Sequence, residues 1–292
     1  MKSKILSVID ISEERIKPEI EEILRLRTNG AYGCFIFGEW SSFPLWNRSG
    51  DAKDALLNQY EGTGKRTSIA DNLPYISELL TTNFKTEKLK WVRVFLLEDG
   101  HVVPHVDFLE SGSFSRIHIP IHTDMSCLHA QEETVFHMNV GEVWYLDATD
   151  VHSACSMSGI SRIQICLDFE PMDSLEEIFA EEHALEHVFI APTVIYRTAV
   201  DDGFFESIYG LSAIVSKNNF RDIIQILSKL HFEWDVSVDG VFDWMIEICS
   251  RSGQKELLDK AIAYKKYCIQ ERSLGEDFFF FNNESNSELI ES

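Results

Sequence analysis

Apolar and polar residues between about 85 and 170 follow a pattern that predicts short β-strands. Five stretches have the length and the β-branched or aromatic composition of strands: KWVRVFLL, RIHIPIH, TVFHM, EVWYL and SRIQICLDF. Side chains alternate along a strand, so the isoleucines of RIHIPIH would point one way and Arg116, His118 and His122 the other. One face could be buried and the other solvated. In a barrel, the apolar face could instead pack outward under helices while the polar face lines an interior site.

The N-terminal part of the chain has a mixed pattern. Asp10 and Glu13 resemble a capping box, which would open a helix whose apolar face includes Ile16 and Ile23. The stretch at 34–51, CFIFGEWSSFPLWNRSGD, is aromatic and has the composition of a loop.

After Pro171 the pattern becomes helical. Three segments carry apolar residues at helical spacing: NFRDIIQILSKL (219–230), VFDWMIEICS (241–250) and KELLDKAIAYKKYCI (255–269). The final NNESNSELIES is polar and acidic, and we expect it to be disordered. The predicted fold class is α+β, with a double-stranded β-helix (jelly-roll or cupin-like) core flanked by helices. Residues 1–178 would hold an N-terminal helical segment and this core, with the barrel at about 85–170, and residues 179–292 a helical C-terminal domain.

The charge of the chain limits its possible partners, and its cysteine content indicates its compartment. The net charge of −22 would repel nucleic acid and anionic membranes. The chain contains no run of 18 apolar residues, so we expect no membrane span. Its start, MKSKILSVIDISEER, has too short an apolar stretch for a signal peptide. The six cysteines are scattered without a C-x-x-C and should be reduced and buried. We therefore expect a cytoplasmic protein without nucleic-acid or membrane partners, with an oligomeric state that the sequence leaves open.

The motif HVVPHVDF places His105 and Asp107 two positions apart at the end of a predicted strand. Their side chains would project from the same side, and imidazole with carboxylate suits Fe(II), Zn(II) or Mn(II). His152, in LDATDVHSA, is the best third ligand because it lies in a turn-like stretch just before a strand. Two histidines and one carboxylate form the facial triad of non-haem iron oxygenases, which keeps positions open for a co-substrate and O₂.

A second H-x-D, formed by His122 and Asp124, competes with the first. In a jelly roll the ligand-bearing strands are neighbours in space but are separated in the chain by several strands, which takes roughly 40 residues. Asp107 lies far enough before His152 for that excursion, whereas Asp124 lies too close. The spacing favours the first pair, and surface exposure or pocket lining explains the second.

A third motif, His183, Glu186 and His187, fits the H-x-x-E-H pattern of zinc peptidases. It lies in LEEIFAEEHALEHVF, where an acidic, solvated helix face explains the same residues. No obvious downstream helix supplies the glutamate that would complete a zinc site. A peptidase is therefore the weaker interpretation.

Arg162 follows His152 by about ten positions, on the polar face of a predicted strand. The planar fork of arginine suits a carboxylate. An Fe(II) oxygenase of this type needs a 2-oxo acid, whose distal carboxylate would require such a partner. Arg116 and His118 share the polar face of their own strand and could add donors.

Together these motifs resemble the bacterial L-proline 3-hydroxylases and their neighbours in the aspartyl/asparaginyl β-hydroxylase-like group of 2-oxoglutarate- and Fe(II)-dependent oxygenases. The motifs span nearly the whole chain: WSSFPLWNRSGD, HVVPHVDF, RIHIPIH, HMNVGEVWYLD, VHSA, the Arg162 strand, and NFRDIIQILSKLHFEWDV followed by FDWM. The C-terminal match is the specific part, because many unrelated oxygenases share the H-x-D…H…R skeleton.

The resemblance implies a set of site residues and a reaction. His105, Asp107 and His152 would bind Fe(II), and Arg162 would bind 2-oxoglutarate. Arg116 and His118 match the arginine and histidine of the family's R-x-H strand. O₂ and 2-oxoglutarate would be consumed, succinate and CO₂ released and a C–H bond hydroxylated, with ascorbate as a stimulant of turnover.

The resemblance also implies a free amino acid as the substrate. Arg93 matches an arginine at the substrate end of the pocket in related hydroxylases and could bind the carboxylate, while Glu110 or Asp168 could bind the ammonium group. Four aromatic residues could wall an apolar ring: Trp40, Phe43, Trp46 and Trp144. A cyclic amino acid, L-proline or L-pipecolic acid, is the first candidate. The segment FLESGSFS at 108–115 is shorter than in the proline 3-hydroxylases, which leaves an acyclic or carrier-bound amino acid as an alternative. An alternative from another functional class is a barrel that binds a metal or small ligand without catalysing a reaction.

Overall fold

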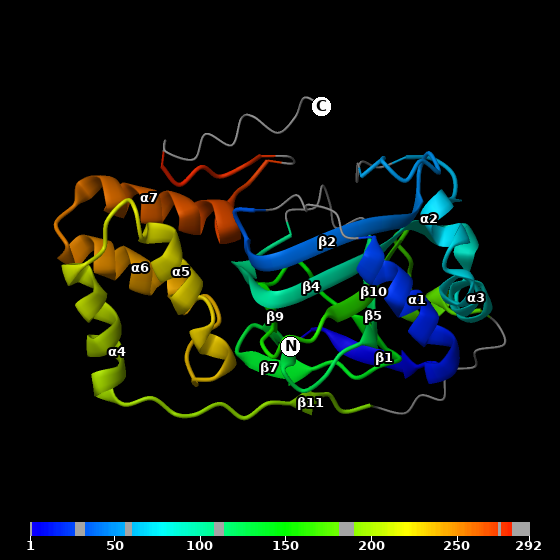
Figure 1. Cartoon of the computed structure of the whole chain (residues 1–292), viewed down its shortest axis with the longest axis horizontal. Coiled ribbons are helices and arrows are strands. Elements are labelled where there is room, and N and C mark those ends of the chain that lie inside the picture. The colour runs from blue at the N-terminus through cyan, green and yellow to red at the C-terminus, as the bar shows by residue number, and fades with distance from the viewer. Residues whose placement is uncertain are drawn as a thin grey trace.

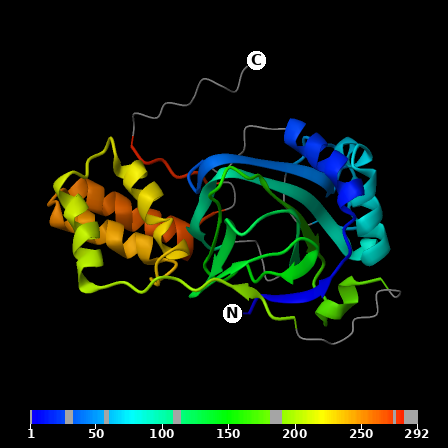
Figure 2. The same cartoon turned by 60° about the horizontal axis from the view of Figure 1, so that its bottom comes forward.

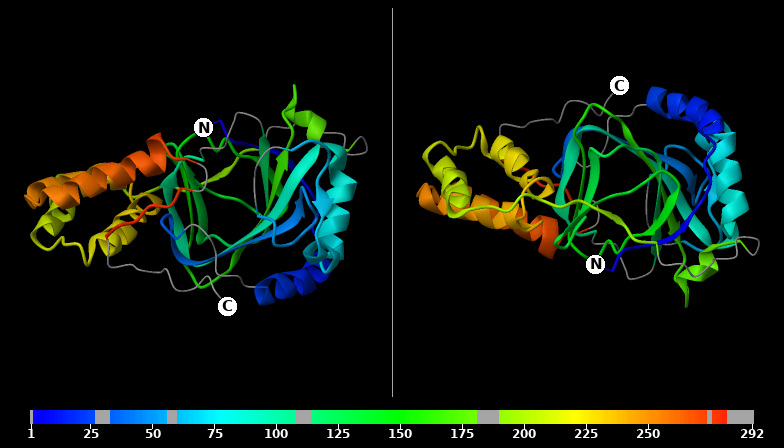
Figure 3. Two further views of the ribbon diagram at one scale, coloured as in Figure 1. Left: turned by 90° about the horizontal axis from the view of Figure 1, so that it is seen from above. Right: turned by 90° about the horizontal axis from the view of Figure 1, so that it is seen from below.

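The computed structural model describes residues 2–26, 33–55, 60–107, 114–180, 190–273 and 276–281. The strands are β1 (Lys4–Val8), β2 (Ile36–Asn47), β3 (Lys65–Arg66), β4 (Leu89–His105), β5 (Ser115–His122), β6 (Cys127–Gln131), β7 (Thr134–His137), β8 (Glu142–Tyr145), β9 (His152–Ser156), β10 (Arg162–Phe169) and β11 (Thr193–Val194). The α-helices are α1 (Glu13–Arg25), α2 (Ser68–Asp71), α3 (Pro74–Asn83), α4 (Asp202–Tyr209), α5 (Phe220–Leu227), α6 (Gly240–Arg251) and α7 (Lys255–Lys265). The sheet lies in the middle, with α1–α3 at one end and α4–α7 at the other (Figures 1 and 3).

The sheet is antiparallel and curls around itself (Figure 2). Its organising element is β4, which pairs with β2 along one edge. Along the other edge β4 pairs first with β10 and then with β9. One half of the sheet therefore continues through β10, β5, β8 and β1, and the other through β9, β6, β7 and β11. The two halves face each other because they branch from the same long strand.

The turn in β4 depends on a close contact between two glycines. Asp99 has a φ of 43°, and Gly38 on the neighbouring β2 has a φ of 101°. A Cβ added to Gly100 would come within 2.0 Å of the Phe37 carbonyl oxygen, so only glycine lets β2 and β4 approach so closely here. This turn directs the end of β4 toward β9.

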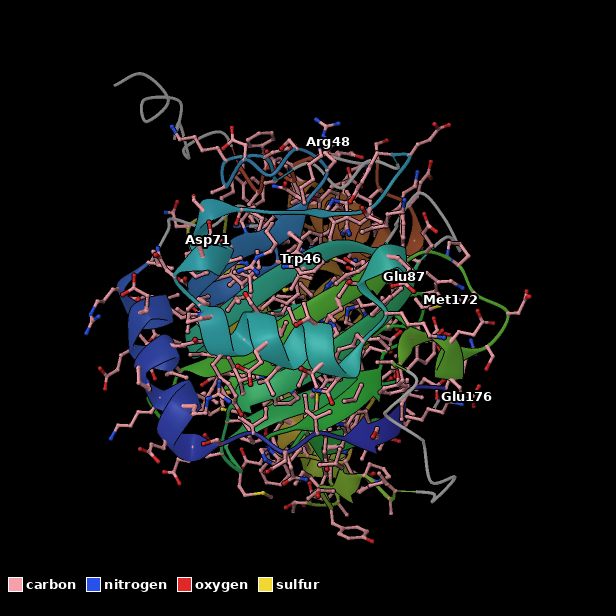
Figure 4. The ribbon with its side chains drawn as sticks, turned by 90° about the vertical axis from the view of Figure 1, so that its right-hand side faces the viewer. Trp46, Arg48, Asp71, Glu87, Met172 and Glu176 are labelled. Atoms are coloured by element: carbon pink, nitrogen blue, oxygen red, sulfur yellow. The ribbon has the colours of Figure 1, made fainter. Side chains whose placement is uncertain are left out.

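The isoleucines of β5 confirm the outward-packing interpretation of the strand pattern. They are joined in one core cluster by the apolar residues of β10 and by residues of α1 and α3. The strand residues in this cluster are Ile117, Ile119, Ile121, Ile163, Ile165 and Leu167. Figure 4 looks onto this end, where α3 crosses in front of the strands and Trp46 is one of the labelled side chains. The polar residues of the same strands consequently face the inside of the curled sheet.

The C-terminal helices pack against the opposite end of the sheet. Their core combines residues that flank or lie within β2 and β4, such as Phe35 and Val103, with helical residues such as Phe220, Phe242 and Tyr264. In Figure 1, α7 ends beside β2 and β4. The three predicted helices of this region are confirmed as α5, α6 and α7, although the predicted division of the chain after residue 178 stays a prediction.

Three sequence predictions need correction. The stretch at 34–51 is mostly strand β2, because Gly38 and Pro44 lie next to register shifts where a strand tolerates them. Ser12, and not Asp10, is the N-cap residue of helix α1, and its side chain makes no capping hydrogen bond. Between Pro171 and α4, the described residues form the short 3₁₀ helix Leu175–Ile178 and β11 but no α-helix.

Further strands were not anticipated. They include β1, β6 and β9, which are short and carry few of the aromatic or β-branched runs that mark a strand. The C-terminal stretch at 282–292 lies outside the described residues. In the part of the chain that the structure describes, no helix combines the length and apolarity that crossing a bilayer requires.

Candidate active site

Three candidate metal ligands meet where β4 pairs with β9. His105, the last residue of β4, lies directly opposite His152, the first residue of β9. Their ring centroids are 4.3 Å apart. Asp107 follows β4, and its Oδ1 is 3.5 Å from His105 Nε2. One ligand atom from each residue lies within 4.8 Å of the other two, and among the described residues this is the one group of three that could hold a metal ion.

Hydrogen bonds leave one nitrogen of each imidazole available to a metal. His105 Nδ1 donates to the Val103 carbonyl (2.9 Å), and His152 Nδ1 donates to the Asp150 carbonyl (3.0 Å). A carbonyl only accepts, so the lone pair of each ring must lie on Nε2. Burial lowers the pKa of His152 to about 4, which keeps this imidazole neutral at pH 7. Neutral histidine, oriented by a backbone carbonyl, is the form that binds transition metals.

Buried ion pairs connect the third ligand to the middle of the sheet. Arg116 Nη1 donates to Asp107 Oδ2, and Arg116 Nε donates to Asp168 Oδ1 (2.7 Å). Arg93 Nη2 donates to the other carboxylate oxygen of Asp168 (2.7 Å). Burial alone would raise the pKa of Asp107, but the neighbouring His105 and the charge of Arg116 hold it well below its ordinary value. Asp107 is therefore ionised, as a metal ligand must be.

Arg162 projects from β10 into the same interior. It is 7% exposed, and its Nη2 approaches the thioether sulfur of Met138 at 3.7 Å. No described carboxylate forms an ion pair with it, and burial lowers its pKa below the ordinary value. A buried charge is costly unless it is paired. This guanidinium is thus arranged to receive an anion from solution.

His118 lies beside Arg162 as a neutral polar group. Its Nδ1 donates to Gln164 Oε1 at 3.0 Å, and Gln164 Nε2 donates to the Met138 sulfur at 3.4 Å. Burial lowers the pKa of His118 to about 3. The imidazole can therefore offer Nε2 to a bound molecule without adding charge.

The candidate ligands and Arg162 line a single cavity of about 530 Å³, a size typical of small-molecule sites. Both halves of the sheet contribute walls, and the segment after α7 closes one end. The polar lining includes Arg93, Arg116, His118, His129, Gln131 and Gln164, and the apolar lining includes Phe35, Ile36, Trp40, Phe95, Leu97 and Val102. The cavity lining thus combines charged and polar groups with apolar ones.

Trp144, which the sequence placed at the substrate, lies elsewhere. It is completely buried in a core cluster, and its Nε1 donates to Glu142 Oε2 at 2.8 Å. The structure therefore corrects that prediction, because an inward-facing aromatic residue of a strand can fill the core as well as wall a pocket. Phe43 and Trp46 also belong to the core, whereas Trp40 does line the cavity.

The competing H-x-D motif does not join this site. His122 Nδ1 donates to the Ser161 carbonyl at 2.6 Å, and Asp124 accepts hydrogen bonds within its own turn. These are structural contacts of a strand end. The H-x-x-E-H motif at 183–187 and Glu110 lie outside the described residues.

Two cavity residues were missed from the sequence. His129, on β6, is 5% exposed and stacks on His152 at 6.0 Å, and its Nδ1 has no partner among the described residues. Gln131, two positions later, has an unpartnered Oε1, while its Nε2 donates to the Asp147 carbonyl at 2.7 Å. His129 and Gln131 are two positions apart, a spacing typical of polar residues on one face of a strand. The segment CLHAQ lacks the β-branched residues that would mark it as a strand, so the spacing alone did not predict one.

The chain matches two known protein families. Residues 4–171 match the family described as Aspartyl/Asparaginyl beta-hydroxylase, which is more than half of the chain. The chain belongs to the aspartyl/asparaginyl beta-hydroxylase family. Residues 176–276 of this hydroxylase match a second family, described as L-proline 3-hydroxylase, C-terminal. The resemblance inferred from the sequence motifs is confirmed.

Relatives of the hydroxylase extend the match over the full chain. L-proline cis-3-hydroxylase 1 of Streptomyces sp is 32% identical over 286 residues, which is 95% of this chain and 98% of the relative. L-proline cis-4-hydroxylase of Rhizobium meliloti (strain 1021) is 30% identical over 278 residues, covering 94% and 99%. A solved 2OG-Fe(II) oxygenase family oxidoreductase from Burkholderia pseudomallei covers 56% of this chain at 9% identity and a TM-score of 0.31. The relatives place the hydroxylase among oxygenase enzymes.

Asp168→Asn is expected to destabilise the hydroxylase, because Arg93 and Arg116 would lose the carboxylate that they share. Breaking a buried ion pair from one side costs about 3–5 kcal/mol. The free energy of unfolding in urea measures this loss. Asp173→Asn, at an exposed position just beyond β10, is the control and should change stability by no more than about 0.5 kcal/mol. Equal losses in both variants would contradict the role assigned to Asp168.

Proposed function

We propose that this hydroxylase uses Fe(II), 2-oxoglutarate and O₂ to hydroxylate a free cyclic amino acid inside a jelly-roll core. The observation that carries the proposal is the buried Arg162, which has no ion-pair partner among the described residues, in the cavity that also holds the three candidate ligands. The distal carboxylate of 2-oxoglutarate supplies the anion that this guanidinium lacks. A site for a metal alone would not need the arginine.

In this proposal His105, Asp107 and His152 hold the metal, since their donor set and protonation states fit Fe(II). Bound Fe(II) would supply the O₂ chemistry that converts 2-oxoglutarate to succinate and CO₂ and hydroxylates a C–H bond. Arg162 binds the distal carboxylate, and His118 lines the cavity beside it with Nε2 as a neutral hydrogen-bond acceptor. The protein's own contribution is binding, orientation and exclusion of water.

Arg116 takes a different role from the one that the sequence suggested. It was expected to add a donor to 2-oxoglutarate, but its guanidinium already donates to Asp107 and Asp168. We assign it to holding the Asp107 carboxylate in its orientation toward the metal. Groups that fix a ligand in this way influence metal affinity nearly as much as a ligand does.

Arg93 lies on the cavity side of β4 and is proposed to bind the substrate carboxylate. Its guanidinium is fixed by Asp168 and lies 4.9 Å from the centre of the Phe95 ring. Asp168 is engaged by two arginines, which leaves it poorly suited to bind the substrate ammonium group. Trp40, Phe95 and Leu97 provide the apolar wall for a ring.

L-Proline and L-pipecolic acid are the first candidates for the substrate. The two named relatives are proline hydroxylases, and they differ in the carbon named, C3 or C4, so the likeness favours proline without choosing a carbon. One additional methylene in an apolar pocket changes discrimination by about 1–3 kcal/mol. Both rings should therefore be hydroxylated, with one preferred by roughly 10- to 200-fold.

The test is to incubate the purified hydroxylase with Fe(II), 2-oxoglutarate and proline, pipecolate, leucine or lysine in parallel. Mass spectrometry should show a gain of one oxygen on the cyclic amino acids and an equivalent amount of succinate. Hydroxylation of leucine or lysine alone would establish the acyclic alternative, and an aminoacyl carrier protein tests the carrier-bound one. Absence of 2-oxoglutarate turnover with every substrate would favour a non-catalytic metal-binding barrel.

Two accompanying proposals have separate grounds. The family resemblance implies that ascorbate stimulates turnover, which the same assay would measure. A cytoplasmic location agrees with the scattered cysteines, and the expectation of no nucleic-acid or membrane partner rests on the net charge of −22.

A further inference from the structure

The backbone between two of the proposed metal ligands is held by the C-terminal part of the chain. Val106 lies between His105 and Asp107, just after β4 ends. Its N–H donates to the Cys268 carbonyl at 3.0 Å, and its own carbonyl accepts from Arg272 Nη2 at 3.1 Å. Both backbone polar groups of this residue are thus satisfied by residues distant in the sequence. Within the sheet, a neighbouring strand would normally make these bonds.

Arg272 is itself held in a stack of rings that ends at a ligand. Its guanidinium lies 4.3 Å from the centre of the Phe35 ring and 5.2 Å from that of Tyr267. The Phe35 ring in turn lies 5.4 Å from the His105 ring and 5.2 Å from the Tyr267 ring. Arg272 Nη1 also approaches the Tyr267 carbonyl at 3.5 Å. The arginine therefore has a fixed geometry, in contact with both the backbone and the ring packing around His105.

We propose that Arg272 is a positioning residue that couples the C-terminal helical region to the metal-ligating end of β4. This inference rests on the proposed function, because it assigns the metal to His105, Asp107 and His152. The planar guanidinium suits the role, since it can stack on Phe35 with its face and donate to a carbonyl with its edge. The C-terminal helices would then belong to the metal site, although they supply none of its ligands.

The experiment measures Co(II) binding to the full-length protein by anaerobic calorimetry, in the absence of 2-oxoglutarate and substrate. Arg272→Ala should weaken Co(II) binding by about 10- to 100-fold, the usual effect of losing a group that orients a ligand. Arg272→Lys keeps a cation over Phe35 and one donor, so it should recover part of the affinity. The KM for 2-oxoglutarate should change little, because Arg162 is untouched.

Arg251→Ala is the matched control. Arg251 also lies over an aromatic ring, 4.3 Å from the centre of Tyr209, and pairs with Glu247, but on the outer surface of the helical region. Its loss should leave Co(II) affinity unchanged, and urea unfolding of each variant reports any general loss of stability. Arg272→Gln, which keeps a hydrogen-bond donor, replaces the alanine variant if that variant does not fold.

The outcomes separate this inference from the proposed function. Wild-type protein that binds no Co(II), or binds it equally well as His105→Ala, would overturn the metal site itself. Wild-type affinity in Arg272→Ala would overturn the positioning role and leave the metal site standing. Unchanged Co(II) affinity with a raised KM for the amino acid would make Arg272 a substrate anchor and would also overturn the proposal.

Discussion

His105→Ala is expected to abolish succinate formation and to weaken Fe(II) binding by more than about 100-fold. Loss of a group that merely orients a ligand already costs about 10- to 100-fold, and this substitution removes a ligand. It also removes the ring that packs between His152 and Phe35. Succinate release and an anaerobic metal titration measure the two effects.

His122→Ala provides the control from the competing H-x-D. Its ring donates to a strand-end carbonyl and lies outside the ligand group, so iron binding should persist in this variant. His187→Ala, in the H-x-x-E-H motif, should likewise bind iron normally. If His122→Ala alone lost the iron, the pairing of β4 with β9 would not be the metal site and the spacing argument would be wrong.

Arg162→Ala is expected to raise the KM for 2-oxoglutarate by well over tenfold. Losing one partner of a buried charge pair costs about 2–5 kcal/mol, and Arg162 has no other described anion with which to pair. Initial rates of succinate formation at varied 2-oxoglutarate measure the change. Metal affinity in the absence of 2-oxoglutarate should be nearly unchanged, because Arg162 belongs to a different wall from the ligands.

Arg162→Lys adds a second measurement. Lysine keeps the positive charge but presents no planar fork, so its KM should fall between those of the wild type and the alanine variant. Arg48→Ala, whose side chain pairs with Asp54 away from the cavity, is the control. A KM in Arg162→Ala equal to that of the wild type would show that the distal carboxylate is bound elsewhere in the cavity.

The sequence predicted those parts of the molecule that follow from alternation and spacing. In β5 and β10 every second residue is apolar, so the face that carries His118 and Arg162 was readable without a structure. The distance between Asp107 and His152 left room for the intervening strands. The prediction that the ligands meet relied on this chain-length argument, and the structure brings His105 and His152 together as a direct cross-strand pair.

Other features depended on contacts that a local pattern does not encode. Trp144 and Trp40 are both aromatic residues of strands, and only the packing of distant segments decides that one fills the core and the other lines the cavity. β2 was taken for a loop because bulges, invisible in the sequence, accommodate its glycine and proline. The contribution of Arg272 to the surroundings of Val106 joins residues that are far apart in the chain.

Because β4 is one continuous strand, it limits how such an enzyme could change the carbon that it oxidises. Arg93 and His105 lie on the same continuous backbone, so the proposed substrate anchor and the first ligand are joined by a rigid spacer. Inserting or deleting one residue between them would turn one side chain to the outer face of the sheet. Lineages that come to oxidise a different carbon should therefore keep the length of β4 and vary the apolar side chains with which β4 and its neighbour β2 line the cavity. A mutant library aimed at new regiochemistry should accordingly randomise Trp40, Phe95 and Leu97 and exclude insertions in β4.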